Sequence, residues 1–170
     1  MNSEIPKIAA AVALPQIGGC VGAYLTLPDL LRWHQRLHFL PVVPPKWMFP
    51  PVWTSVNAGI GYASYLVWKE GGGFNGTAKL PLMLYGTQLA LNWAWSPIFF
   101  KLHDHKWSYL ESLVHAGAVA ATGFAFFNVN KIAGYLVFPY FVWCTCASLL
   151  NFEIYVRQPG DTATVEEESS

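Results

Sequence analysis

The stretch that decides the fold is residues 107–152. It reads WSYLESLVHAGAVAATGFAFFNVN, then a single lysine at 131, then IAGYLVFPYFVWCTCASLLNF. Each apolar run exceeds the roughly 20 residues that a helix needs to cross a bilayer core of about 30 Å. A backbone in lipid must satisfy its own hydrogen bonds, and the short alternating strands of a barrel are absent from this sequence. We therefore predict two transmembrane helices, antiparallel because almost nothing connects them.

Three stretches nearer the N-terminus have the same length and contain no charged residue. We therefore predict an all-α membrane protein, a bundle of five transmembrane helices forming one domain over residues 1–157. The expected spans are about 8–28, 47–68, 80–100, 107–130 and 132–152. Residues 158–170 are polar and include three successive glutamates, so we expect a disordered acidic tail.

Composition supports this class of protein. Charged residues make up 12% of the chain, against about 25% in soluble domains. The net charge is zero, so no nucleic-acid partner is indicated. Basic residues number six on the side of the C-terminus and four on the other side, which favours a cytosolic C-terminus. Three cysteines, none in a CxxC pair, are expected to be buried, reduced thiols.

The third span contains a candidate binding pair. Asn92 lies in mid-span, where an unpaired amide is costly, and Trp95 follows three residues later on the same face. An indole beside an amide suits a flat apolar ligand with a polar edge. The alternative is a structural hydrogen bond between helices, with Trp95 as packing. The spacing leaves both interpretations open.

Two further segments have a structural and a functional interpretation. Residues 44–53 read PPKWMFPPVW, and the two Pro-Pro pairs predict a stiff junction at the start of the second span. In the fifth span Trp143, Ala147 and Leu150 form one stripe, beside which a kink at Pro139 could open space for a ligand. Such a stripe is also typical of an ordinary core.

Other polar and small residues of the spans are candidates for a functional site or a helix contact. Glu111 and His115 are four apart in the fourth span, and an ionisable pair there is a functional candidate. Glu111 is near the expected interface, so we predict a solvated pair instead. The sequence contains no catalytic constellation and no defensible metal-ligand set. Gly86, Ala90 and Ala94, four residues apart, predict a homodimer through the third helix.

Several stretches together carry a family resemblance: GYASYLVWKE (61–70), LNWAWSPIFF (91–100) and PYFVWCTCASLLN (139–151), with GG (18–19), GAY (22–24) and LRW (31–33). The combination resembles the translocator protein family, also called tryptophan-rich sensory proteins or peripheral-type benzodiazepine receptors. The resemblance covers roughly residues 15–157 and all five spans in order.

The resemblance implies a clockwise-packed bundle with one pocket that opens toward the cytosol, under a lid formed by residues 29–46. The implied lining residues are Ala23, Thr26, Phe49, Trp53, Asn92, Trp95, Trp107, Trp143, Ala147 and Leu150. Implied ligands are protoporphyrin or haem, cholesterol and synthetic benzodiazepine or isoquinoline compounds, with no required cofactor. Val42, Phe49 and Pro50 depart from the family pattern, so the resemblance implies the synthetic compounds as ligands without indicating how tightly they bind.

The implied role is sterol or porphyrin transport across the mitochondrial outer membrane. Light-dependent porphyrin degradation by an enzyme and a lipid-binding scaffold are the alternatives. The family's proposed sterol motif is matched by Leu150, Tyr155 and Arg157, with Glu153 inside it. The alternative for these residues is a simple interfacial anchor. The sequence itself does not choose between these roles.

Overall fold

The computed structural model describes residues 4–36, 46–101 and 105–157, and within these ranges some side chains near the ends of α1, α3 and α5 are not described. The described chain forms five α-helices and no strand, which confirms the predicted all-α bundle. The helices are α1 (Ile5–Arg36), α2 (Phe49–Glu70), α3 (Lys79–Lys101), α4 (His105–Val129) and α5 (Lys131–Arg157), with short 3-10 turns η2 (Lys46–Met48) and η3 (Gly73–Asn75).

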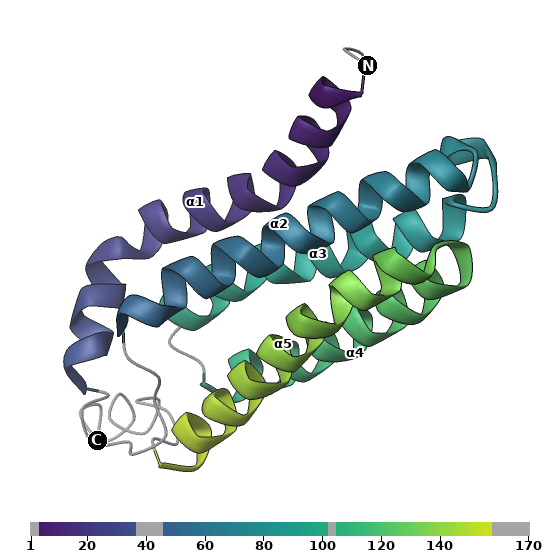
Figure 1. Ribbon diagram of the computed structural model, residues 1–170. Coiled ribbons are helices and arrows are strands. Elements are labelled where there is room, and N and C mark those ends of the chain that lie inside the picture. The colour runs from purple at the N-terminus through teal and green to yellow at the C-terminus, as the bar shows by residue number, and fades with distance from the viewer. Residues whose placement is uncertain (1–3, 37–45, 102–104, 158–170) are drawn as a thin grey trace, which may run out of the picture.

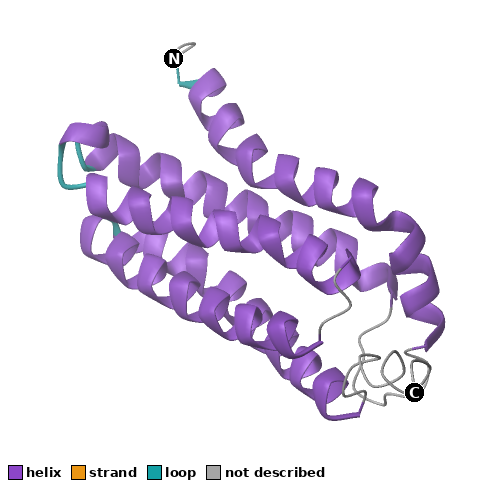
Figure 2. Cartoon of the chain, turned by 180° about the vertical axis from the view of Figure 1, so that it is seen from behind, coloured by secondary structure: helices purple, strands orange, loops and turns teal. Residues whose placement is uncertain are grey.

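The five helices pack as a closed ring in the order α1, α2, α5, α4, α3 (Figure 1). Successive helices run in opposite directions, so the start of α1, η3 and the α4–α5 turn share one end of the bundle, hereafter the turn end. The start of α2 and the ends of α3 and α5 lie at the other end, hereafter the C-terminal end (Figure 2). A single residue, Asn130, separates α4 from α5, as the sequence predicted.

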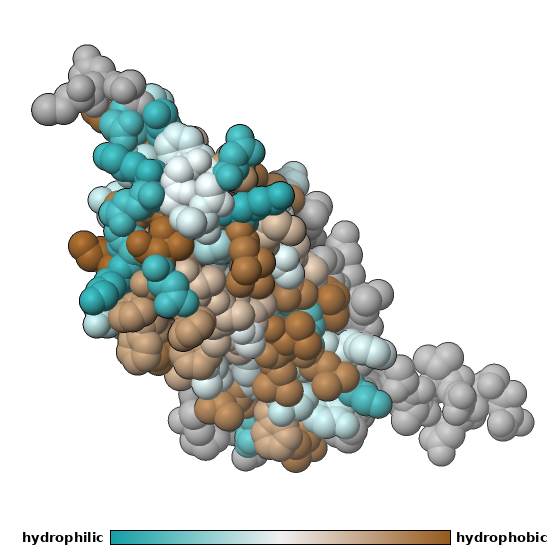
Figure 3. Space-filling view, turned by 90° about the vertical axis from the view of Figure 1, so that its right-hand side faces the viewer, coloured by the Kyte–Doolittle hydropathy of each residue, from teal (hydrophilic) through white to brown (hydrophobic). Residues whose placement is uncertain are grey.

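The outer surface of the bundle is apolar. Large hydrophobic side chains point outward along the helices, among them Met83, Val114, Phe124 and Leu149. Figure 3 looks onto the turn end, where hydrophilic residues gather on one side and hydrophobic residues cover much of the remainder. In the described chain α1, α4 and α5 are long and apolar enough to cross a membrane. The surface therefore suits hydrocarbon rather than water.

Two glycines allow α1 to approach its neighbours. A Cβ on Gly61 of α2 would meet the carbonyl oxygen of Ala11 and lie 2.8 Å from Cα of Val12, so only glycine fits this crossing. A Cβ on Gly18 would overlap the indole of Trp93 on α3. Trp93 thus packs against α1, and Gly18 is used for packing inside the monomer. Such close approach supplies the van der Waals contact on which membrane helices depend.

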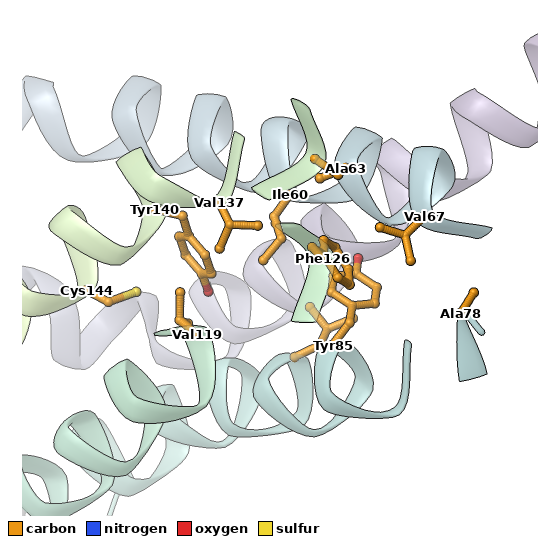
Figure 4. Close-up of a cluster of buried hydrophobic side chains, with 12 residues drawn as sticks. Ile60, Ala63, Val67, Ala78, Tyr85, Val119, Phe126, Val137, Tyr140 and Cys144 are labelled. Carbon is orange, nitrogen blue, oxygen red and sulfur yellow. The ribbon is translucent and has the colours of Figure 1, made fainter. Parts of the chain in front are cut away.

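The apolar core fills the half of the bundle nearer the turn end. Phe126 and Tyr85 pack with ring centroids 6.0 Å apart, between Ile60 and Val67 of α2 (Figure 4). Val119, Val137 and Tyr140 continue the cluster toward the middle of the bundle. This half offers an incoming ligand only well-packed side chains.

Polar contacts close the turn end. The carboxylate of Glu4 accepts a hydrogen bond from the hydroxyl of Tyr65 and lies 3.2 Å from Nζ of Lys69. These two contacts, with a further one from Lys7, lower the pKa of Glu4 to about 2. Nδ2 of Asn130 donates to Oε1 of Glu70 at 2.5 Å. The start of α1 and the α4–α5 turn are therefore both tied to the end of α2.

The sequence expectations about the end of α1 and about the cysteines need correction. Helix α1 does not end near residue 28 but continues to Arg36, because DLLRWHQR contains no glycine or proline that would stop it. Part of the expected lid is thus helical, and residues 37–45 lie outside the described chain. Cys144 is buried, but Cys20 and Cys146 are exposed on the apolar outer surface; all three are free. The predicted tail, 158–170, also lies outside the described residues.

Candidate ligand-binding site

A chain of three polar side chains crosses the middle of the bundle. Nδ2 of Asn92 on α3 donates to the phenol oxygen of Tyr140 on α5 at 2.5 Å. That oxygen lies 3.2 Å from Nε2 of His115 on α4. Because Tyr140 already accepts from Asn92, its own proton is available to His115. All three side chains are buried, and the chain connects three helices through the interior of the ring.

Aromatic rings lie beside this polar chain. Trp53 of α2 contacts Tyr140 edge to face, with centroids 6.3 Å apart. Nearer the C-terminal end Phe49 contacts Trp143 in the same manner at 5.5 Å. Four of these aromatic residues therefore meet between α2 and α5. Edge-to-face rings next to hydrogen-bonding groups match the expected chemistry of a site for flat ligands.

The remaining residues of the predicted pocket lining differ in their exposure. Trp95, Ala147 and Leu150 are half-buried on α3 and α5. Trp107, at the start of α4, is 62% exposed. The side chains of Ala23 and Thr26 lie outside the described part of α1. The lining by all ten residues stays a prediction.

The predicted solvated pair of Glu111 and His115 is wrong. His115 is 6% exposed, and its ring faces Tyr140 with centroids 5.9 Å apart. Both carboxyl oxygens of Glu111 are buried, without a hydrogen-bond partner in the described chain. The prediction followed from the position of Glu111 along the helix. Which sides of α4 are covered by its neighbours is decided by the packing of the bundle.

Sequence reasoning also missed Gln88 and Asn57. Gln88 is 0% exposed, and neither atom of its amide has a partner among the described residues. Oδ1 of Asn57 is likewise buried and unpaired, although its Nδ2 donates to the carbonyl of Trp53 at 2.9 Å. Gln88 is four residues before Asn92 and shares its face, a spacing that could have drawn attention to it.

The polar interior extends toward the C-terminal end. Oγ of Ser148 on α5 lies 3.0 Å from the carbonyl oxygen of Ser112 on α4 and 2.9 Å from that of Cys144. Nδ2 of Asn151 donates to the carbonyl oxygen of Ala147. Polar groups therefore occupy the half of the bundle that the apolar core leaves.

The proposed sterol motif lies on the last turns of α5. Tyr155 stacks on Tyr109 of α4, with centroids 6.1 Å apart and planes 9° from parallel. One face of the Tyr155 ring is thus already covered by the protein. Tyr109 also contacts Phe152 at 5.3 Å. The side chain of Arg157 lies outside the described part of the structure.

A helical ring with an apolar exterior and polar and aromatic side chains in its interior defines a multi-pass integral membrane protein. Residues 11–157 match the TspO/MBR family. The chain belongs to this family, as the resemblance predicted.

Relatives from animals and bacteria show the same membership. The chain is 41% identical over 151 residues to the translocator protein of Bos taurus, covering 86% of this chain and 89% of the relative. It is 40% identical over 156 residues to that of Homo sapiens, covering 92% of each chain. The tryptophan-rich sensory protein of Cereibacter sphaeroides is 36% identical over 147 residues, covering 84% of this chain and 89% of the relative.

Proposed function

We propose that this protein is a membrane translocator or sensor that binds a porphyrin, haem or a sterol inside its helical ring. The observation that carries the proposal is the buried chain from Asn92 through Tyr140 to His115, with Trp53 against its central ring. The relatives' names, translocator protein and tryptophan-rich sensory protein, support the role.

The physical case rests on what each part of the interior supplies. Flat polycyclic molecules gain from contact with Trp53 and Trp143, because aromatic contacts add to the burial of apolar area. Their polar groups need hydrogen-bonding partners, which the Asn92 region provides. The apolar core closes the turn end, so a ligand would enter from the C-terminal end or between helices there.

Protoporphyrin binding to purified protein in detergent tests the proposal. We expect micromolar or tighter affinity, measured as quenching of tryptophan fluorescence. The double variant Trp53→Ala, Trp143→Ala should bind more weakly. The matched control is Trp47→Ala. This tryptophan of η2 is 73% exposed, and its substitution also removes a tryptophan fluorophore. Equal affinity in the double variant and the wild type would contradict the site.

The finer parts of the proposal concern place and cargo. We propose the mitochondrial outer membrane as the location and cholesterol or protoporphyrin as the cargo. Synthetic benzodiazepine or isoquinoline compounds are proposed as ligands of the same interior. Vesicles that contain the protein and a labelled sterol would test transport. A transfer rate equal to that of protein-free vesicles would leave binding alone as the function.

A further inference from the structure

The carboxyl group of Glu111 is a buried acid without a partner. Both of its oxygens are buried, and neither has a hydrogen-bond partner in the described chain. The buried face of α4 runs through Ser108, Ser112 and His115, and Glu111 lies one turn before His115 on the flank of that face. The buried oxygens place this carboxyl inside the packed bundle rather than on its outer surface.

The neighbouring polar groups are already engaged. Nε2 of His115 faces Tyr140, and the carbonyl oxygen of Ser112 faces Oγ of Ser148. The thiol of Cys144 belongs to the packed core. No lysine that the structure describes is bonded to Glu111, and these lysines stand at the ends of helices: Lys7, Lys69, Lys79, Lys106 and Lys131. No described residue supplies the donor that this carboxyl lacks.

An unpaired carboxylate in a membrane interior is costly, and a charged partner removes most of that cost. A carboxylate accepts several hydrogen bonds and donates none. Its strongest partners are cationic N–H groups, whose bonds are shorter and roughly twice as strong as neutral ones. Beside a neutral group the acid would stay protonated and gain no ion pair, and an anionic group would repel its charged form.

We propose that Glu111 is a ligand anchor that recognises a protonated amine on a flat aromatic molecule bound beside Trp53 and Tyr140. The inference rests on the proposed function, because the ring system of the ligand occupies the same interior. It adds a charge preference of the site: ligands with a cationic substituent are favoured over ligands with a neutral one.

Two porphyrins that differ only in their side chains test the preference at pH 7. One carries two tertiary-amine amides of protoporphyrin, and the other is the neutral protoporphyrin dimethyl ester. Dissociation constants are measured by tryptophan quenching for the wild type, Glu111→Gln and Glu70→Gln. Glu70 is the matched control, since it undergoes the same change of charge at the exposed turn end.

We expect the wild type and Glu70→Gln to bind the amine about tenfold or more tightly than the ester, as a hydrogen bond to a charged group implies. In Glu111→Gln the affinity for the ester should hold while the preference for the amine disappears. The ligand-free melting temperature of Glu111→Gln should not fall, because the substitution removes an unpaired buried acid.

The outcomes separate this inference from the proposed function. If neither porphyrin binds to the wild type, the proposed function fails. If both bind and Glu111→Gln keeps the wild-type preference, or the wild type shows none, Glu111 is not the anchor and the inference is overturned.

Discussion

Asn92 and Tyr140 are 48 residues apart, and their side chains meet at 2.5 Å in the interior of the bundle. Their helices, α3 and α5, are not neighbours in the described ring, so this hydrogen bond spans its interior. Of the two interpretations of Asn92, the structure shows the interhelical bond. A role in binding a ligand stays a prediction beside it.

A double-mutant cycle on Asn92→Leu and Tyr140→Phe measures this bond. We expect each single substitution to lower the stability of the ligand-free protein, with a coupling energy between about 0.6 kcal/mol, the average for hydrogen bonds between membrane helices, and about 1.7 kcal/mol, the largest value. Thermal melts in detergent provide the four values. Additive effects would mean that the two residues act independently. An unchanged melting temperature for Asn92→Leu would mean that this amide does not stabilise the ligand-free protein, which would leave ligand binding as its role.

Alanine substitutions at Gly61 and Gly86 together test the packing of α1 against α2. Gly61→Ala should destabilise the protein by about 1 to 3 kcal/mol, because the new methyl group meets the backbone of α1. Gly86→Ala should be neutral or stabilising by up to about 1 kcal/mol, because nothing lies within 4 Å of its Cβ and alanine favours the helix. Equal losses in both variants would show that the α1–α2 crossing is not tight.

Gly86 also tests the predicted dimer. It is exposed on α3, with Ala90 one turn along, so this face is open for a second copy of the chain. Gly86→Leu should shift the protein toward monomer, measured by cross-linking in liposomes, without lowering the stability of the monomer. A population of dimers equal to that of the wild type would exclude this face of helix three.

The contacts of Glu4 predict a dependence of stability on pH. The folded pKa of Glu4 is about 2, below its ordinary value of 4.5, so the unfolded chain binds a proton first as the pH falls. The contribution of Glu4 to the stability of the folded protein is therefore complete above about pH 4.5 and is lost progressively toward pH 2. Contacts with Glu4 and Tyr65 raise the pKa of Lys69, so its contribution is present up to the ordinary value and is lost above it.

Melting temperatures between pH 2 and 6 check this prediction. Glu4→Gln should flatten the acid limb of the wild-type curve, because glutamine does not titrate. Glu70→Gln, at the same end of the bundle, should retain that limb. A Glu4→Gln curve that falls in parallel with the wild type would assign the acid sensitivity to other groups.

The sterol motif predicts an asymmetry between two residues of α5. Leu150 and Tyr155 are five residues apart, about 7.5 Å along the axis and some 140° around it, so one flat sterol cannot touch both on a straight helix. Tyr155 already stacks on Tyr109. Tyr155→Phe should therefore change little, whereas Arg157→Leu should weaken binding by removing the polar contact. Photo-crosslinkable cholesterol reports both, and labelling lost only in the tyrosine variant would reverse the assignment.

The number and order of the helices were predictable because apolar length is a local property of the chain. The end of α1 was predicted too early, because the expected span follows the uncharged stretch that ends before Asp29, whereas the helix continues beyond that stretch. Of the candidate site, Trp53, Asn92 and Trp143 could be named from residue type and family resemblance. Gln88 was missed although it shares the face of Asn92, and the sequence could not indicate that its amide and Oδ1 of Asn57 are left unpaired, because pairing depends on the neighbouring helices.

The sequence by itself determined that the chain is a helical membrane protein of the TspO/MBR family, because the hydrophobic length of a span and a family motif are both written in consecutive residues. Only the tertiary structure decided which polar groups meet. The partner of Asn92 is on a helix that is not its neighbour in the ring, and the burial of Glu111 depends on the helices that cover its flank. Burial and pairing arise from packing between distant segments, and no local pattern encodes them.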